Sequence, residues 1–256
     1  MNSNNKNIVI TSAVRTAVGT FKGSLKNMQG HDLGSVVVKG AIEKSKLKMN
    51  EVDELIMGQV LTAAAGQNPA RQAAIQAGLP IEKPAYIINQ VCGSGLRSIA
   101  AGYQAIMSND SNIVVAGGQE SMSNAPHAIS IRDDQKLEES NLVDTMIKDG
   151  LWDAFNGYHM GITAENVAAK WQITREDQDD FALLSQTKAE QAQKDGKFKN
   201  EIVPVILKSK KGNTIFEIDE HPRAGMTLET LRRLNPAFKK NGSVTAGNAS
   251  GINDGA

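Results

Sequence analysis

Apolar positions in the first half of the chain alternate between two periods. Short, β-prone apolar runs occupy residues 8–14, 54–61, 85–91 and 112–116, and such runs are typical of buried strands. Helical spacing fills the intervals, with one helix expected from near Asp32, a second over residues 69–77 and a third over 93–107. This strand–helix order predicts an α/β fold, a layered α-β-α arrangement with a mainly parallel sheet.

Local signals mark where these helices should begin and end. Asp32 is a candidate cap for a helix whose apolar stripe begins at Leu33. Pro69 opens the second helix and Gly78 lies just past its end, which is the usual placement of proline and glycine around a helix.

The pattern changes after Gly118. Residues 120–150 are polar with few strand signals, and two helices are then expected, one capped by Thr163 and a longer one capped by Thr174. Residues 201–207 and 213–218 resemble two short strands around a basic turn. We therefore divide the chain into an α/β core over 1–119, a mainly helical inserted loop domain over 120–249, and the start of a strand returning to the core over 250–256.

Composition narrows the classes of function. Lys plus Arg and Asp plus Glu both number 28, so the charge gives no reason to expect nucleic acid or an anionic membrane as a partner. No apolar run approaches the roughly 18 residues that span a bilayer, and residues 1–7 lack the apolar core of a secretory signal. A single cysteine excludes an intrachain disulfide, and a reducing, cytoplasmic location fits best.

That cysteine, Cys92, follows a predicted strand and precedes a predicted helix, with Gly93 and Gly95 allowing a tight turn. A thiol there lies at the positive end of the helix dipole, beside unpaired N–H groups. Both favour the nucleophilic thiolate, and the N–H groups suit the oxyanion of an attacked thioester. A buried, inert cysteine is the alternative interpretation.

Two other motifs are weaker in the same segment. Gly93 and Gly95 followed by Ser98 nearly match a dinucleotide-binding loop, with Glu120 as a candidate ribose acid, but the third position should be Gly or Ala. The Gly-x-Ser-x-Gly elbow of lipases is absent, because the residue two before Ser94 is Cys92.

Several blocks of sequence, in order, resemble the thiolase family. Residues 89–96, Asn-Gln-Val-Cys-Gly-Ser-Gly-Leu, are similar to the thiolase nucleophile motif. The other blocks are 15–21, 66–73, 117–123, 159–166, 221–223 and 245–254. The resemblance covers essentially the whole chain and implies the thiolase-like layered α-β-α fold, with 1–119 as the N-terminal core and 120–249 as the inserted loop domain.

The resemblance implies acyl transfer between coenzyme A thioesters. A cysteine takes an acyl group from acyl-CoA, and a second acyl-CoA, deprotonated at its α-carbon, attacks the acyl-enzyme to form a C–C bond. The best-matching function condenses two acetyl-CoA to acetoacetyl-CoA, or runs in reverse, as in acetyl-CoA C-acetyltransferases. A 3-ketoacyl-CoA thiolase of fatty-acid degradation is the close alternative. No metal and no cofactor besides the coenzyme A substrates are expected.

The resemblance also assigns roles to individual residues. Cys92 matches the nucleophile. His159 and Met160 match the pair that lines the pocket near the thioester, although His159 is also interpretable as a polar residue ahead of the Thr163 cap. Substrate contacts are further implied for Leu151, an apolar wall beside pantetheine, for Arg223 near the adenine, and for Ser250 on the pantetheine, where a plain turn residue is the other interpretation.

The chain departs from the family at its end. Thiolases continue with a strand that completes the first domain and with a second α/β domain carrying an Asn-Glu motif, a Gly-His-Pro histidine and a Cys-x-Gly motif. Neither a Gly-His-Pro nor a Cys-x-Gly sequence occurs in the 256 residues, and Cys92 is the only cysteine. We therefore expect a truncated thiolase that is acylated at Cys92 but does not condense, or an inactive remnant. Intact relatives are expected to be homo-oligomers, dimers of dimers, to which residues 121–131 contribute.

Overall fold

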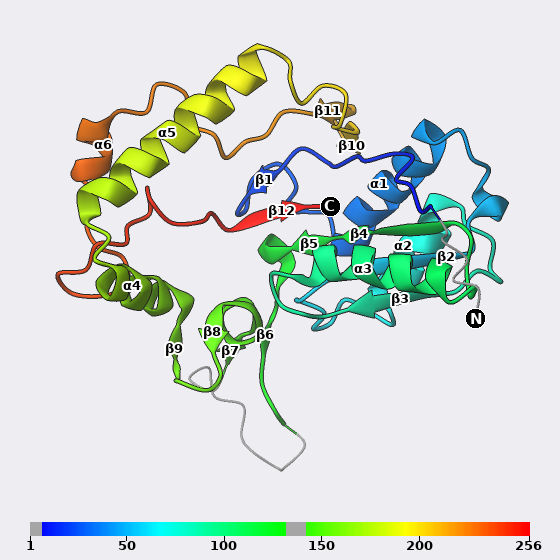
Figure 1. The fold of residues 1–256 in the computed structure, drawn as a ribbon, viewed down its shortest axis with the longest axis horizontal. Coiled ribbons are helices and arrows are strands. Elements are labelled where there is room, and N and C mark those ends of the chain that lie inside the picture. Colours follow the sequence, from blue (N-terminus) through cyan, green and yellow to red (C-terminus); the bar gives the residue numbers. More distant parts are fainter. Residues whose placement is uncertain (1–6, 132–141) are drawn as a thin grey trace. The chain divides into compact units, whose positions relative to one another are not determined.

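The chain forms two compact units, seen in a computed structural model that describes residues 7–131 and 142–256 (Figure 1). The first unit contains the described residues of Met1–Ala125, together with Asn200–Ile218 and Asn253–Ala256. The second contains those of Pro126–Lys199 and Asp219–Ile252. Residues 1–6, at the start of the segment assessed for a secretory signal, and 132–141 of the expected insertion lie outside the described residues.

A three-stranded parallel sheet organises the first unit. Strand β2 (Glu54–Gly58) lies in the centre, between β3 (Ala85–Ile88) and β4 (Val114–Gly118). Leu55 lies opposite Ala85 on one side and Val115 on the other. Every residue of β2 is buried, as expected for a central parallel strand covered on both faces.

Helices cover both faces of this sheet (Figure 1). Helices α1 (Gly30–Lys44) and α2 (Pro69–Ala77) form one apolar core with the side chains that point to their face, among them Leu55 and Met57. Helix α3 (Ser94–Met107) packs on the other face. Because alternate residues of a strand point to opposite faces, the apolar run of β2 contributes side chains to the helix layers on both faces of the sheet. The predicted α-β-α layering is confirmed.

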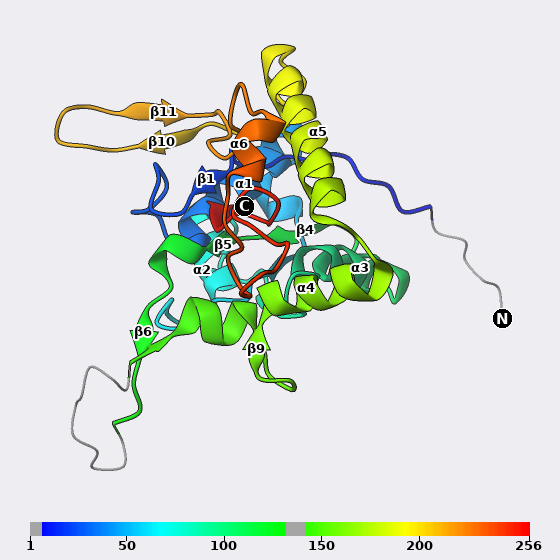
Figure 2. The ribbon, with the colours of Figure 1, turned by 90° about the vertical axis from the view of Figure 1, so that its left-hand side faces the viewer.

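A second core lies under a hairpin and is lined by helix α1 and by residues next to a small antiparallel sheet. The sheet consists of β1 (Gly19–Thr20), β12 (Asn253–Gly255) and β5 (Glu120–Ser121). The hairpin consists of β10 (Val205–Leu207) and β11 (Thr214–Phe216), seen from its side in Figure 2. Val205 and Phe216 pack against Ala17, Leu25 and Leu33.

The hairpin segment was assigned to the insertion from sequence, whereas its contacts place it with the first unit. The Arg15 N–H donates to the Glu201 carbonyl and the Val203 N–H donates to the Arg15 carbonyl, both at 2.8 Å. These bonds join positions far apart in the chain, which a local pattern does not reveal. The predicted strands 201–207 and 213–218 are present in shortened form.

The second unit is mainly helical. Its long helices are α4 (Met160–Trp171) and α5 (Arg175–Lys194), with a short α6 (Leu228–Arg232). Short pairs β6 (His127–Ala128) with β7 (Val143–Asp144) and β8 (Trp152–Asp153) with β9 (Tyr158–His159) flank a π-helical turn at Met146–Leu151. Turns of 3-10 helix occur at Met49–Glu51 and Met122–Asn124 in the first unit. No helix within the described residues is long and apolar enough to cross a membrane.

Helix boundaries follow the sequence in part. The Thr174 cap is confirmed: its hydroxyl accepts the Asp177 N–H, and Asp177 bonds back to Thr174. Asp32 is not a cap but the third residue of α1, where it accepts the Gln29 N–H. Thr163 lies inside α4, which begins earlier because His159 supplies the cap.

The strand expected over residues 8–14 is not formed. Val9 is 73% and Ile10 is 79% exposed, and no strand is assigned between residues 7 and 14. A strand is defined by bonds to a neighbour, and within the described residues no neighbour pairs with this segment. An apolar β-prone run is therefore not enough by itself.

Candidate active site

Cys92 occupies the turn between β3 and α3, as predicted, and it is exposed. The preceding Val91 has a φ of 49°, a left-handed conformation that is strained for a β-branched residue. Side chains hold this turn: Asn89 Oδ1 accepts the Val91 N–H at 3.0 Å, and Ser94 Oγ accepts the Gln90 N–H at 2.8 Å. Ser94 Oγ also donates to the Val91 carbonyl at 2.6 Å. The conformation next to the thiol is thus determined by three side-chain bonds.

Close glycine contacts place the first turn of α3 on the ends of two strands. A Cβ on Gly58, at the end of β2, would lie 2.4 Å from the Ser94 carbonyl carbon. A Cβ on Gly118, at the end of β4, would lie 3.4 Å from Gly95 Cα. The Ser98 hydroxyl is also within 2.7 Å of the Gly117 carbonyl. Helix and sheet approach so closely here that a larger residue at Gly58 does not fit.

The arrangement suits a nucleophile at a helix N-terminus. Gly93 caps α3 without any side-chain hydrogen bond, so no side chain occupies the first N–H groups of the helix. The positive end of the helix dipole favours an oxyanion that forms beside Cys92. The geometry can therefore support attack of a thiolate on a thioester carbonyl.

Glu120, the candidate ribose acid of the dinucleotide-binding motif, instead binds backbone N–H groups of the first unit. Its carboxylate accepts the Val60 N–H at 2.8 Å and the Leu61 N–H at 3.2 Å. Burial raises the pKa of this carboxyl, and the hydrogen bonds from Val60, Leu61 and Ser121 offset only part of the effect. The side chain is committed to the backbone that follows β2, which argues against a nucleotide contact.

His159 is the cap of α4 in the second unit. Its Nδ1 accepts the Gly161 N–H at 3.0 Å, so the neutral ring carries its proton on Nε2. The ring stacks on Phe238, with centroids 4.8 Å apart and planes inclined by 19°. Phe238 packs so closely that a Cβ on Gly161 would lie 2.2 Å from its ring. Both the cap and the stack fix the orientation of the imidazole.

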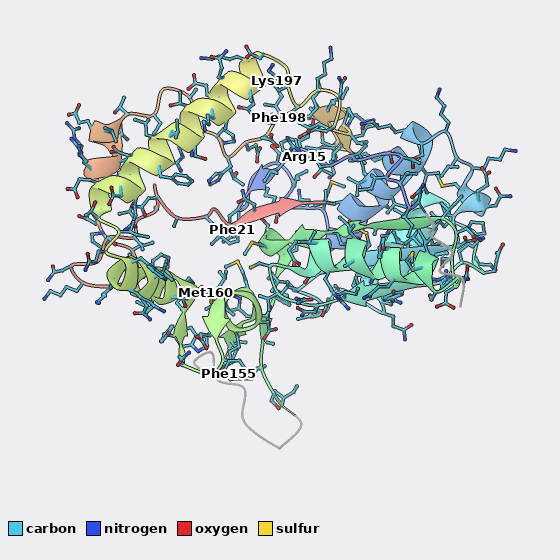
Figure 3. The ribbon with its side chains drawn as sticks, in the orientation of Figure 1. Arg15, Phe21, Phe155, Met160, Lys197 and Phe198 are labelled. Carbon is cyan, nitrogen blue, oxygen red and sulfur yellow. The ribbon has the colours of Figure 1, made fainter. Side chains whose placement is uncertain are left out.

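Strand pairing brings Leu151 and Met160 next to His159. Trp152 lies opposite His159 in the antiparallel pair β8–β9, so the residues just outside this pair, Leu151 and Met160, flank it on the same side. Met160 is 44% exposed at the start of α4, where Figure 3 labels it. Phe155, almost fully exposed, lies in the turn between the two strands (Figure 3). Exposed apolar side chains thus occur at both ends of this strand pair.

Ser250 and Arg223 lie in loops of the same unit. Both are exposed, and the Arg223 N–H donates to Gln186 Oε1 on α5 at 3.0 Å. Ser250 ends the segment 243–250, which we call the return loop. Five of the six predicted site residues therefore belong to the second unit and Cys92 to the first. That they share one pocket stays a prediction.

Two buried carboxylates of this unit were missed from sequence. Glu165 on α4 is 6% exposed and Asp179 on α5 is 1% exposed, and both bond to the return loop. One signal was available for Glu165: it falls on the buried stripe of α4, one turn from Gly161 and three residues before Ala168. A carboxylate on a buried helix face requires a partner.

The comparisons with known proteins agree on one family. The description "Thiolase, N-terminal domain" matches residues 8–256. The acetyl-CoA acetyltransferase of Paracoccus denitrificans is 60% identical over 97% of this chain and 63% of its own length. That of Rhizobium meliloti (strain 1021) is 58% identical, over 98% of this chain and 64% of its own length.

A solved structure extends the likeness to three dimensions. The crystal structure of the Bacillus anthracis acetyl-CoA acetyltransferase superposes with a TM-score of 0.94 at 43% identity, over 98% of this chain and 64% of that one. The chain thus spans somewhat less than two thirds of the length of these relatives.

Proposed function

Because the chain belongs to the thiolase family, we propose that it carries the acyl-accepting half of an enzyme that condenses two acetyl-CoA to acetoacetyl-CoA or cleaves the product in reverse. The observation that carries the proposal is the exposed Cys92 thiol between β3 and the N-terminus of α3. The names of the relatives favour acetyl-CoA over longer substrates.

In the first step, Cys92 Sγ attacks the carbonyl carbon of acetyl-CoA. The new S–C bond forms, the bond between that carbon and the coenzyme A sulfur breaks, and coenzyme A leaves as a thiolate that takes up a proton. Dividing the reaction in this way replaces one difficult step by two easier ones. N–H groups at the start of α3 stabilise the oxyanion that forms in between.

In the second step, which we assign to the whole protein, the α-carbon of another acetyl-CoA loses a proton and attacks the acetyl group on Cys92. A C–C bond forms, the bond to Cys92 Sγ breaks, acetoacetyl-CoA is released, and a proton equivalent to the one lost from the α-carbon restores the Cys92 thiol. His159 and Met160 line the pocket, and Leu151, Ser250 and Arg223 contact coenzyme A. No metal and no cofactor beyond the coenzyme A substrates takes part.

The test is turnover by the whole protein. We expect acetoacetyl-CoA cleavage by coenzyme A to exceed cleavage of longer 3-ketoacyl-CoA, and Cys92→Ala to abolish both. Ser108→Ala, at the exposed far end of α3, serves as the control and should leave turnover unchanged. Full turnover by the Cys92→Ala protein would refute the proposed role, and a preference for long chains would favour a degradative 3-ketoacyl-CoA thiolase.

A homo-oligomeric whole protein, a dimer of dimers, and a cytoplasmic location belong to the same proposal. They rest on the thiolase resemblance and on the single cysteine of the chain. Analytical ultracentrifugation of the whole protein at micromolar concentration measures the first directly, and a monomer there contradicts it.

A further inference from the structure

The return loop begins at a carboxylate that accepts several hydrogen bonds. Glu165 Oε1 accepts the N–H groups of Ser243 at 2.9 Å and Val244 at 2.8 Å. The Ser243 hydroxyl donates to Glu165 Oε2 at 3.1 Å and accepts from Gln178 Nε2 at 2.9 Å. One buried side chain of α4 therefore fixes two consecutive amides of a loop almost eighty residues away.

The backbone just before the return loop packs closely against the Glu165 carboxylate. A Cβ on Gly242 would lie 2.3 Å from Glu165 Oε1, so the loop approaches the carboxylate with no room for a side chain. Burial raises the pKa of Glu165, but the hydrogen bonds from Ser243 and Val244 and the nearby Lys239 outweigh it, and the pKa lies below its ordinary value. The loop therefore binds the ionised form.

The same loop is braced internally as far as Asn248. Asn248 Oδ1 accepts the Thr245 N–H at 2.7 Å, and Asn248 Nδ2 donates to the Ser243 carbonyl at 3.1 Å and to Asp179 Oδ1 at 2.9 Å. Residues 243–248 thus form one hydrogen-bonded turn, which Glu165 holds at its start and Asp179 holds at its end. Ser250 follows two residues later, exposed, and its hydroxyl bonds to no other side chain or backbone group of the described residues.

We propose that Glu165 is a positioning residue for coenzyme A: by holding the amides of Ser243 and Val244, it keeps the return loop in the shape that presents Ser250 to the ligand. The inference rests on the proposed function, in which Ser250 contacts the pantetheine. Pre-organising a loop lowers the entropy lost on binding. Glu165 itself need not touch the ligand.

The experiment compares Glu165→Gln with the wild-type chain and with Glu176→Gln. Glu176 is an exposed carboxylate in the first turn of α5, so its variant is the matched control. In Glu165→Gln, the new side chain would offer an amide N–H₂ where the loop needs an acceptor. Affinity for coenzyme A is measured by calorimetry, loop order by hydrogen exchange at Ser243, Val244 and Thr245, and thiol reactivity by iodoacetamide alkylation of Cys92.

We expect Glu165→Gln to lose amide protection in the return loop and to weaken coenzyme A binding by about tenfold, with the alkylation rate of Cys92 unchanged. Glu165→Asp, which keeps a carboxylate, should restore part of the affinity, and Glu176→Gln should match the wild type. A merely structural role would instead lower protection throughout the second unit and slow folding of α4.

Two results overturn the inference. Protection at residues 243–245 that is unchanged in Glu165→Gln shows that the carboxylate does not hold the loop. Wild-type affinity in a variant whose loop is disordered shows that loop order does not matter for binding. Failure of the wild-type chain to bind coenzyme A, with the loop still protected, instead counts against the proposed function of the second unit.

Discussion

The two units are stabilised by different means. The first contains both extended apolar cores, one between the parallel sheet and helices α1 and α2, the other under the β10–β11 hairpin. In the described residues of the second unit, few hydrophobic side chains are buried, and polar ones are buried beside them. The hydrophobic ones are Met146, Ala168, Leu231 and Val244, and the polar ones Thr145, Glu165, Asp179 and Thr245.

The difference extends to how each unit positions the groups to which we assign a function. Cys92 is placed by backbone geometry: a strand end, a strained Val91 and glycines that let α3 approach β2. The loop that precedes Ser250 is held by side chains, because Glu165 bonds to Val244 and Asp179 bonds to Asn248. We therefore expect the position of the Cys92 thiol to tolerate polar substitutions elsewhere. The conformation of the return loop should instead depend on the charges of Glu165 and Asp179.

Asp179→Ala should have the largest effect on stability. Asp179 accepts from Arg175 Nε at 2.8 Å and from Asn248 at 2.9 Å, and its removal leaves the Arg175 side chain without this partner. Breaking a buried ion pair costs about 3–5 kcal/mol. Both tryptophans, Trp152 and Trp171, lie in the second unit, so urea unfolding followed by their fluorescence reports it. A loss no larger than that of exposed Asp180→Ala would contradict the account.

Gly58→Ala should disturb the position of the Cys92 thiol in the first unit. The added Cβ would meet Ser94 and Gly95, and overpacking typically costs about 1–3 kcal/mol. Because the strain falls on the first turn of α3, the alkylation rate of Cys92 should change. Gly117→Ala is the control, since a Cβ there meets only Met57 Sδ at 3.9 Å. Identical alkylation rates in the two variants would show that the glycine contact does not position the thiol.

Acid should remove the contribution of Glu165. Its pKa in the folded chain lies below the ordinary 4.5, so the stability it provides is present above that value and is lost as the pH falls through the folded pKa. Wild type and Glu165→Gln should differ by on the order of 1–2 kcal/mol at neutral pH, and the gap should close in acid. Urea unfolding at several pH values measures it, and a gap that widens in acid would reverse the assignment.

The smallest expected effects come from two threonines of the second unit, Thr174 and Thr163. Thr174→Ala removes a cap whose hydroxyl accepts the Asp177 N–H, which should cost about 1 kcal/mol. Thr163→Ala should cost far less, because Thr163 lies within α4 and only its weak contact to Met160 Sδ at 3.8 Å is lost. Equal losses in thermal unfolding would show that Thr163 has a role that its place inside the helix does not explain.

What could be predicted from sequence follows from the range of the interactions involved. The α/β order, the ends of α2 and the position of Cys92 depend on local periodicity and on glycine and proline, so they were found. The caps Asp32 and Thr163 were misplaced because neighbouring residues compete for the same N–H groups. The hydrogen bonds of Arg15 to the hairpin segment, and those of Glu165 and Asp179 to the return loop, join positions far apart in the chain. Local sequence patterns give little indication of such contacts.

The acyl acceptor is identified by incubating the chain with acetyl-CoA and locating the acetyl group by mass spectrometry. We expect a single acetyl group, on the peptide that contains Cys92, formed with release of coenzyme A and absent from Cys92→Ala. A chain that gains no acetyl group at Cys92 at saturating acetyl-CoA, or a Cys92→Ala chain that is acetylated to the same extent, would contradict the proposed role of Cys92.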